Sequence, residues 1–302
     1  MDETQMLAAF DRLVEEGTVL YNPDQRVVTH RDSNLQFHFV LSSAVANKPT
    51  FQKLSTQPTT PQDDDTSERR PGSDITTAGF EIGSLGDTHV IAVNKFCYAR
   101  PSLMLVTADG HRRQHEPLDE SDLRAARDAL APTAEGDYMV FYNGGKDAGC
   151  SRMHKHMQLM PLPRESFAAF LDEEEGHRGE PPVPFEWAHH RHKHDLKDLS
   201  VESLVRTYNG LLQTSTKAWR KSVSLETREA NTEKHGAGCP HNFILTKRWM
   251  MVIPRRQAAV GQAATNAPGM LGYISVATQE DIDNWIRLGA RATLQVLGVP
   301  RS

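Results

Sequence analysis

The most constraining feature of this sequence is residues 143–161, where a glycine-rich loop runs directly into alternating polar side chains. Three glycines, at positions 144, 145 and 149, surround Lys146. Glycines let the main chain turn tightly and approach a ligand closely, so main-chain N–H groups can point at phosphate oxygens. The loop therefore predicts a site for an anion such as a phosphate group.

The residues that follow the loop alternate as they would in a strand. His154, His156 and Gln158 are spaced by two, and side chains at this spacing share one face of a strand. Before the loop, the apolar and aromatic run 138–142 predicts the strand that leads into it. The expected local structure is a strand, a phosphate-binding loop and a second strand that carries a histidine face.

This pattern suits transfer of a phosphoryl-linked group. Imidazole is a nucleophile near neutral pH because much of it is unprotonated there. It can attack phosphorus and form a covalent phosphoramidate, which divides one difficult displacement into two easier ones. A bare pair of histidines is more often a solvated strand or half of a zinc site. Here the glycine-rich loop and Gln158 fit a phosphate better than a metal.

Other segments predict regular elements around this centre. Helical periodicity is present in residues 2–16, 119–130 and 199–219, and in a final helix that begins at Thr278 with Asp281 as its capping partner. Strand patterns are present in residues 35–41, 89–95 and 103–107, and a hairpin is expected from 243–246 and 250–253.

Composition excludes several classes of function. The chain has 302 residues and a net charge of −5, so no basic field favours a nucleic-acid polymer as partner. Its three cysteines are too few and too widely spaced for a disulfide framework, which is typical of a reducing compartment. No signal-like N-terminus and no apolar run of membrane-spanning length is present. We expect a cytoplasmic protein, or one shared with the nucleus, without a membrane partner.

Two polar segments are interpreted as lacking a specific role. Residues 54–77 are rich in Ser, Thr, Pro, Gln and Asp and predict a flexible insertion. The run from His189 to His194 holds four histidines, but no cysteine or carboxylate pair accompanies them at the spacing of a zinc site. A solvated loop is the preferred interpretation of this cluster, ahead of a metal site.

The motif at His154, His156 and Gln158 resembles the histidine-triad superfamily in its nucleotidyltransferase branch, where glutamine replaces the third histidine. Further blocks resemble fungal diadenosine tetraphosphate phosphorylases, which are also called ATP adenylyltransferases. In chain order these blocks are 37–41 with 46–49, 93–97 with 103–107, and 242–254. The resemblance covers roughly residues 35–50 and 79–297.

The resemblance implies an α+β fold of the histidine-triad type, with a central antiparallel sheet flanked by helices. It implies a catalytic domain over residues 1–240 and a C-terminal module over 241–302 that packs on the same sheet. The implied reaction is reversible phosphorolysis, in which diadenosine tetraphosphate and inorganic phosphate give ATP and ADP. No tightly bound cofactor is expected, and any divalent cation would arrive on the substrate phosphates. The partners are then small nucleotides, with the oligomeric state left open.

The resemblance also assigns roles to residues. His156 attacks the α-phosphorus and carries AMP, and His154 supports it through a main-chain carbonyl that holds the other ring nitrogen. Gln158 binds phosphoryl oxygens. The remaining substrate contacts that it implies are Lys48, Asn94, Lys95, Asn143, Gly144, Gly145, Ser151 and Lys247.

Two alternatives remain open. One is a related nucleotidyltransferase or hydrolase that acts on another nucleotide, such as adenylyl sulfate. Gln158 argues against plain hydrolysis, because the glutamine branch transfers its nucleotide to an acceptor. The other is a nucleotide-binding sensor without catalysis. Base specificity and polyphosphate length cannot be derived from the residues.

Overall fold

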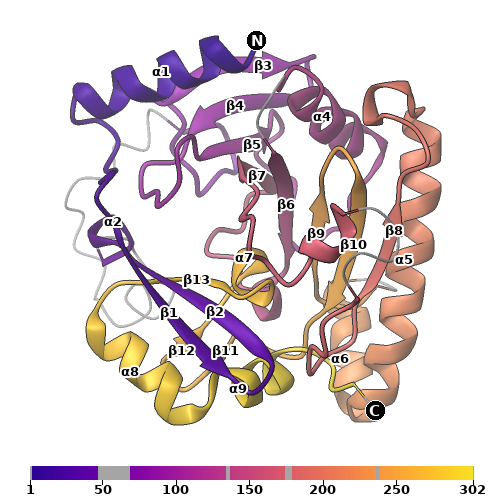
Figure 1. Cartoon of the computed structure of the whole chain (residues 1–302). Helices are drawn as coiled ribbons and strands as arrows, with labels where there is room; N and C mark the ends of the chain where they lie inside the picture. The colour runs from indigo at the N-terminus through magenta and orange to yellow at the C-terminus, as the bar shows by residue number, and fades with distance from the viewer. Residues whose placement is uncertain (1, 47–68, 134–136, 174–178, 236–237, 302) are drawn as a thin grey trace.

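The computed structural model describes residues 2–46, 69–133, 137–173, 179–235 and 238–301. Within this part of the chain, an eight-stranded sheet forms the centre, and each pair of neighbouring strands in it is antiparallel (Figure 1). In spatial order its strands are β3 (Glu81–Leu85), β4 (His89–Val93), β5 (Leu103–Thr107), β7 (His156–Pro161), β6 (Tyr138–Gly144), β9 (His241–Leu245), β10 (Trp249–Pro254) and β8 (Ala188–Arg191). The predicted α+β class with a central antiparallel sheet is confirmed.

One face of this sheet is covered by three helices, α1 (Glu3–Glu15), α4 (Glu120–Leu130) and α5 (Val201–Ser222). Each presents an apolar stripe to one shared core, as the helical periodicity predicts. A reciprocal capping box fixes the start of α4, because Asp119 accepts the N–H of Asp122 and Asp122 accepts the N–H of Asp119. The three predicted helices are confirmed.

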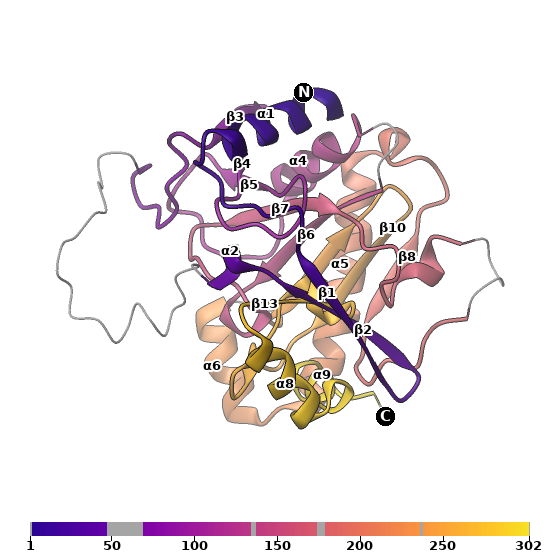
Figure 2. The same cartoon turned by 60° about the vertical axis from the view of Figure 1, so that its left-hand side comes forward.

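The opposite face is covered by a small sheet and by the C-terminal helices (Figure 2). The small sheet has the order β1 (Arg26–Asp32), β2 (Leu35–Leu41) and β13 (Tyr273–Val276). Leu35, Phe37 and Phe39 of β2 are at most 2% exposed, so the alternation that predicts this strand also identifies its buried face. The small sheet brings the N-terminal and C-terminal parts of the chain together, since β13 pairs with β2 in parallel.

The final helix is divided in two. Thr278 and Asp281 form the expected capping box of α8 (Gln279–Leu288), but Gly289, at φ +78°, ends it and α9 (Ala290–Leu297) follows. Ile286 of α8 is 40% exposed. The shorter elements are α2 (Ser43–Ala46), η2 (Lys146–Ala148), η3 (Ala169–Leu171), η4 (Leu196–Asp198), α6 (Leu225–His235), β11 (Ala259–Val260), β12 (Ala263–Ala264) and α7 (Ala267–Met270).

The interpretation of residues 54–77 as a flexible insertion is corrected at its C-terminal end. Residues 54–68 lie outside the described part of the chain. In residues 69–77, Arg69 Nε donates to Thr76 Oγ1 at 3.1 Å, and Ile75 is only 5% exposed. The low apolar content of this segment conceals its order, which comes from local hydrogen bonds between Ser73 and Ile75 and from the packing of Ile75 against Val90 and Val106.

The histidine cluster at 189–194 is also more ordered than a solvated loop. Residues 188–191 form β8, which pairs with β10 at the edge of the large sheet. Among the described residues no group of three or more histidine, cysteine or carboxylate side chains is placed to hold a metal ion. Within the same residues no helix is both long and apolar enough to cross a membrane.

Candidate active site

His156 is the first residue of β7 and is 6% exposed. Its Nδ1 lies 2.8 Å from the main-chain oxygen of His154. A carbonyl oxygen can only accept, so Nδ1 carries the ring proton and Nε2 keeps the lone pair of the neutral imidazole. This is the carbonyl contact expected from the sequence, and it selects the tautomer that a nucleophile requires.

The ring of His154 is enclosed by the protein. Its Nδ1 lies 2.7 Å from Ser73 Oγ, and its Nε2 lies 2.9 Å from Thr107 Oγ1 and 3.1 Å from the main-chain oxygen of Asp109. The residue is 0% exposed, and burial lowers its pKa, so the ring is neutral at physiological pH. The ring of His154 therefore supports the strand, while its carbonyl orients His156.

Gln158 lies two residues further along the same face of β7. Its Oε1 lies 3.5 Å from Nδ2 of Asn94, which follows β4, so the structure brings these two predicted residues together. Lys95 follows Asn94 in the chain, and its Nζ lies 5.9 Å from the centre of the Phe80 ring and 5.8 Å from that of Phe96. Both distances are within the range of cation–π contacts.

The glycine-rich loop begins where β6 ends. Gly145 has φ +94° and Gly149 has φ +85°, conformations that favour glycine, and a Cβ on Gly149 would lie 2.4 Å from the carbonyl oxygen of Thr265. Gly144 closes β6, and Ser151 follows the loop in a half-buried bend. The predicted order of strand, tight glycine loop and strand is confirmed, but β7 holds only His156 and Gln158, since His154 lies before it in an isolated bridge to Arg113.

Asn143 has a structural environment. It is 4% exposed, and its Oδ1 accepts hydrogen bonds from Asn242 Nδ2 at 2.8 Å and from the N–H of Ala267 at 3.0 Å. Asn242 Nδ2 also donates to the carbonyl oxygen of Ala148 at 2.8 Å. The two asparagines thereby tie the loop to β9 and to the start of α7.

Two further lysines are expected at the substrate. Lys48 lies outside the described part of the chain. Lys247 lies in the turn between β9 and β10, where its Nζ donates to the carbonyl oxygen of Thr133. Gly144 pairs with His241 whereas Val140 pairs with Leu245, so this turn is at the far end of β6 from the loop, roughly 13 Å along the strand. The structure places Lys247 away from the glycine loop, and its contact with the substrate stays a prediction.

Three residues at the site carry no signal in the sequence. Asp74 accepts the N–H groups of Met153 at 2.7 Å and of His154 at 2.8 Å, and Ser73 contacts the His154 ring. Gln114 contacts the main chain of His156. The pair at 73–74 is hidden by its polar neighbours, and Gln114 lies in a polar loop without periodicity, so only the folded chain reveals them.

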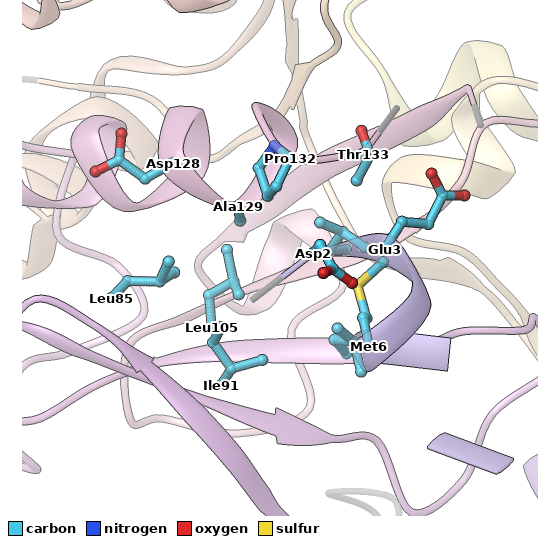
Figure 3. Close-up of a pocket in the computed structure, with 12 residues that line it drawn as sticks. Asp2, Glu3, Met6, Leu85, Ile91, Leu105, Asp128, Ala129, Pro132 and Thr133 are labelled. Carbon is cyan, nitrogen blue, oxygen red and sulfur yellow. The ribbon is translucent and has the colours of Figure 1, made fainter. Parts of the chain in front are cut away.

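A small cavity near α1 is separate from this site (Figure 3). It has a volume of about 30 Å³, and Leu105 and Leu159 line it. Leu159 follows Gln158 in β7, so their side chains point to opposite faces of the sheet. The cavity therefore lies under α1 and α4, away from the histidine face.

Comparisons with known proteins agree with this geometry. The family model described as the Ap4A phosphorylase N-terminal domain matches residues 28–171, and that of the ATP adenylyltransferase C-terminal domain matches residues 181–300. The chain belongs to the Ap4A phosphorylase family. The predicted boundary at residue 240 falls inside the second match, and the division into domains stays a prediction.

Two proteins that are similar to this chain come from Saccharomyces cerevisiae. Diadenosine 5′,5‴-P1,P4-tetraphosphate phosphorylase 2 is 28% identical over 218 residues, which are 64% of this chain and 64% of the yeast protein. Protein APA1 is 25% identical over 254 residues, 78% of this chain and 76% of the yeast protein. The crystal structure of yeast Ap4A phosphorylase Apa2 has a TM-score of 0.76 at 19% identity and covers 100% of this chain and 99% of its own, which shows the same fold.

In this member of the Ap4A phosphorylase family, a buried cation lies behind the glycine loop. Arg255 is 0% exposed, its Nη1 donates to Asn242 Oδ1 at 2.7 Å, and the same nitrogen lies 3.5 Å from the carbonyl oxygen of Ala148. Burial lowers its pKa to about 9, which still leaves the guanidinium charged at neutral pH. A positive charge behind the glycine loop favours an anion in front of the loop.

Proposed function

We propose that this protein is a diadenosine tetraphosphate phosphorylase, which converts diadenosine tetraphosphate and inorganic phosphate into ATP and ADP. The observation that carries the proposal is the contact between His156 Nδ1 and the His154 carbonyl, at the end of a glycine-rich loop. It leaves a nucleophilic lone pair on Nε2 beside a loop suited to phosphate. Family membership and the yeast relative named as a phosphorylase support the choice of substrate.

The mechanism has two displacements at one phosphorus. In the first, Nε2 of His156 forms a bond to the α-phosphorus of one adenylate, and the bond to the bridging oxygen breaks, so ATP leaves with the electron pair. In the second, an oxygen of inorganic phosphate attacks the same phosphorus, the P–N bond breaks and ADP forms. The attacking phosphate releases its proton to solvent, and Nε2 regains its lone pair.

The surrounding residues assist each displacement. While AMP is attached to Nε2, the imidazole ring carries positive charge, and the His154 carbonyl stabilises it through the Nδ1 proton. We assign Gln158 and Asn94 to the phosphoryl oxygens, and Ser151 at the end of the glycine loop to the rest of the polyphosphate. Four N–H groups of the loop, those of residues 145, 148, 149 and 150, donate to main-chain carbonyl oxygens and so fix the shape of the loop. The nearby Cys150 is a poor competitor, because burial raises the pKa of its thiol to about 12.

Cofactor use and location are part of the same proposal. A divalent cation would travel on the substrate phosphates rather than in a resident site. The three cysteines are buried free thiols, which supports a reducing compartment such as the cytoplasm or the nucleus. The proposed partners are small nucleotides.

Product analysis by chromatography tests the proposal. The protein is incubated with diadenosine tetraphosphate, with and without inorganic phosphate, beside a His156→Ala control. Equal ATP and ADP that require phosphate and are absent from the control are the expected result. ATP and AMP without phosphate would identify a hydrolase. No product from this substrate but turnover of adenylyl sulfate would identify a related transferase. Binding without turnover of either would identify a nucleotide sensor.

A further inference from the structure

Strands β6 and β7 separate at the point where the site begins. Their register runs from Tyr138 opposite Pro161 to Phe141 opposite Gln158. Continued by two residues, it would place Asn143 opposite His156, and the two main chains would bond to each other. Instead, a side chain from a distant loop occupies the position of those bonds.

That side chain is the amide of Gln114, which is 1% exposed. Its Oε1 accepts the N–H of His156 at 2.8 Å. Its Nε2 donates to the carbonyl oxygen of Asn143 at 3.1 Å and to that of His156 at 3.0 Å. The amide therefore replaces a peptide group between the two strands and uses both of its N–H bonds and its oxygen.

The main chain of Gln114 is held from both sides as well. Its N–H donates to the carbonyl oxygen of Met153 at 2.8 Å, and its carbonyl oxygen accepts the N–H of Gly145 at 2.9 Å. The hydroxyl of Tyr142 donates to the same carbonyl at 2.6 Å. One residue thus joins the glycine loop to the histidine strand, and the spacing between them depends on it.

We propose that Gln114 is a positioning residue that sets the separation between the nucleophile His156 and the phosphate-binding loop. The inference rests on the proposed function and adds a residue to it. The side-chain amide lies between β6 and β7 where they separate, which we call the fork. Two of its hydrogen bonds fix the main chain of His156, and the third holds the carbonyl oxygen of Asn143. A misplacement of about 1 Å can reduce the rate about 100-fold, so transfer of AMP to His156 is expected to depend on this amide.

Gln114→Glu provides a test with a characteristic pH dependence. A protonated carboxyl can still accept the N–H of His156 and donate its O–H to one of the two carbonyl oxygens. An ionised carboxylate would be buried against both carbonyl oxygens, so its pKa is expected to rise. The ratio of the variant rate to the wild-type rate is expected to fall about 100-fold as pH rises from about 5.5 to about 9.5.

Two further variants complete the comparison. Gln114→Met has a similar length but no polar atoms, so its rate is expected to be low at every pH. Gln213→Glu introduces the same charge on the exposed face of α5 and is expected to track the wild type. A flat ratio for Gln114→Glu, or wild-type turnover by Gln114→Met, would overturn the inference. If Gln114→Met does not fold, the pH profile of Gln114→Glu decides.

Hydrogen exchange separates this inference from the proposed function. The amide of His156 donates to Gln114, so its exchange is expected to accelerate at least about 10-fold in Gln114→Met, corresponding to a loss near 1.4 kcal/mol, and to stay unchanged in Gln213→Met. If the wild type forms no AMP–enzyme, the proposed function fails. The exchange rate of the His156 amide then remains as the test of whether Gln114 holds the two strands at the fork. Unchanged exchange in Gln114→Met would refute that role whatever the activity.

Discussion

Lys155 lies between the two histidines in sequence, yet its side chain lies on the opposite face of the sheet, where it is 1% exposed. Its Nζ donates to Asp122 Oδ2 at 2.6 Å and to the carbonyl oxygen of Pro117 at 2.8 Å. Asp122 is also 1% exposed, and its Oδ1 lies 3.1 Å from Nε2 of His89. This buried ion pair fastens the strand that carries His156 to the start of α4.

Lys155→Met tests how strongly this pair holds the strand. The substitution keeps the length of the side chain but leaves the Asp122 carboxylate without its ammonium partner in a site closed to water. Breaking a buried pair from one side costs about 3–5 kcal/mol of unfolding free energy. For a chain of this size we expect the unfolding midpoint to fall by roughly 6 °C or more. Asp122→Asn is expected to cost a similar amount, because it leaves the ammonium unpaired.

Urea unfolding followed by circular dichroism measures both single variants and the double variant. Each single substitution leaves one buried charge without its partner. The double variant should therefore lose about 2 kcal/mol less unfolding free energy than the sum of the two single losses. Lys197→Met is the matched control, since Lys197 and its partner Asp195 are 67% and 75% exposed, and it should cost less than about 1 kcal/mol. Equal losses for Lys155→Met and the control, or additive losses in the double variant, would refute this reasoning.

Three further predictions concern the site and its surroundings. His156→Ala should abolish the radiolabelled AMP–enzyme while AMP binding by calorimetry persists; a labelled protein would contradict the assignment. Asp74→Ala should lower unfolding free energy by about 2 kcal/mol in urea and reduce turnover, because two N–H groups at Met153 and His154 lose a carboxylate acceptor. Burial lowers the pKa of His241 to about 4. An unfolded histidine takes up a proton near pH 6.5. Stability should therefore fall as pH drops from about 6.5 to about 4, by about 3 kcal/mol from this residue. His241→Gln should remove that part of the pH dependence; an unchanged slope would show that His241 is not the group responsible.

The sequence predicts the local elements of the site well, because each depends on short-range patterns. The spacing of His154, His156 and Gln158 fixes a common face in any strand. The glycines predict a tight loop, and two of them adopt positive φ. The apolar alternation of residues 35–41 likewise identifies a strand that the structure confirms.

Long-range placement escapes such patterns. The hairpin that carries Lys247 is predicted correctly, but whether its turn faces the histidines depends on the register of β9 against β6. That register is set by contacts between segments about a hundred residues apart, which periodicity does not record. For the same reason the polar neighbours of Ser73 and Asp74 suggest a flexible chain, while the fold uses both side chains to enclose His154.

The site therefore arises from a strand pair that is prevented from closing. If the antiparallel pairing continued past Phe141 and Gln158, the two main chains would hydrogen-bond to each other. Gly145 and His156 would then not diverge. The amide of Gln114 supplies the hydrogen bonds that the opened strands lose, so opening costs little polar contact. The buried Lys155 and the Asp74 carboxylate hold the histidine strand from its two sides. Reactivity at His156 then depends on Gln114 and Asp74, which come from two loops, and on the buried pair that Lys155 forms with the start of α4.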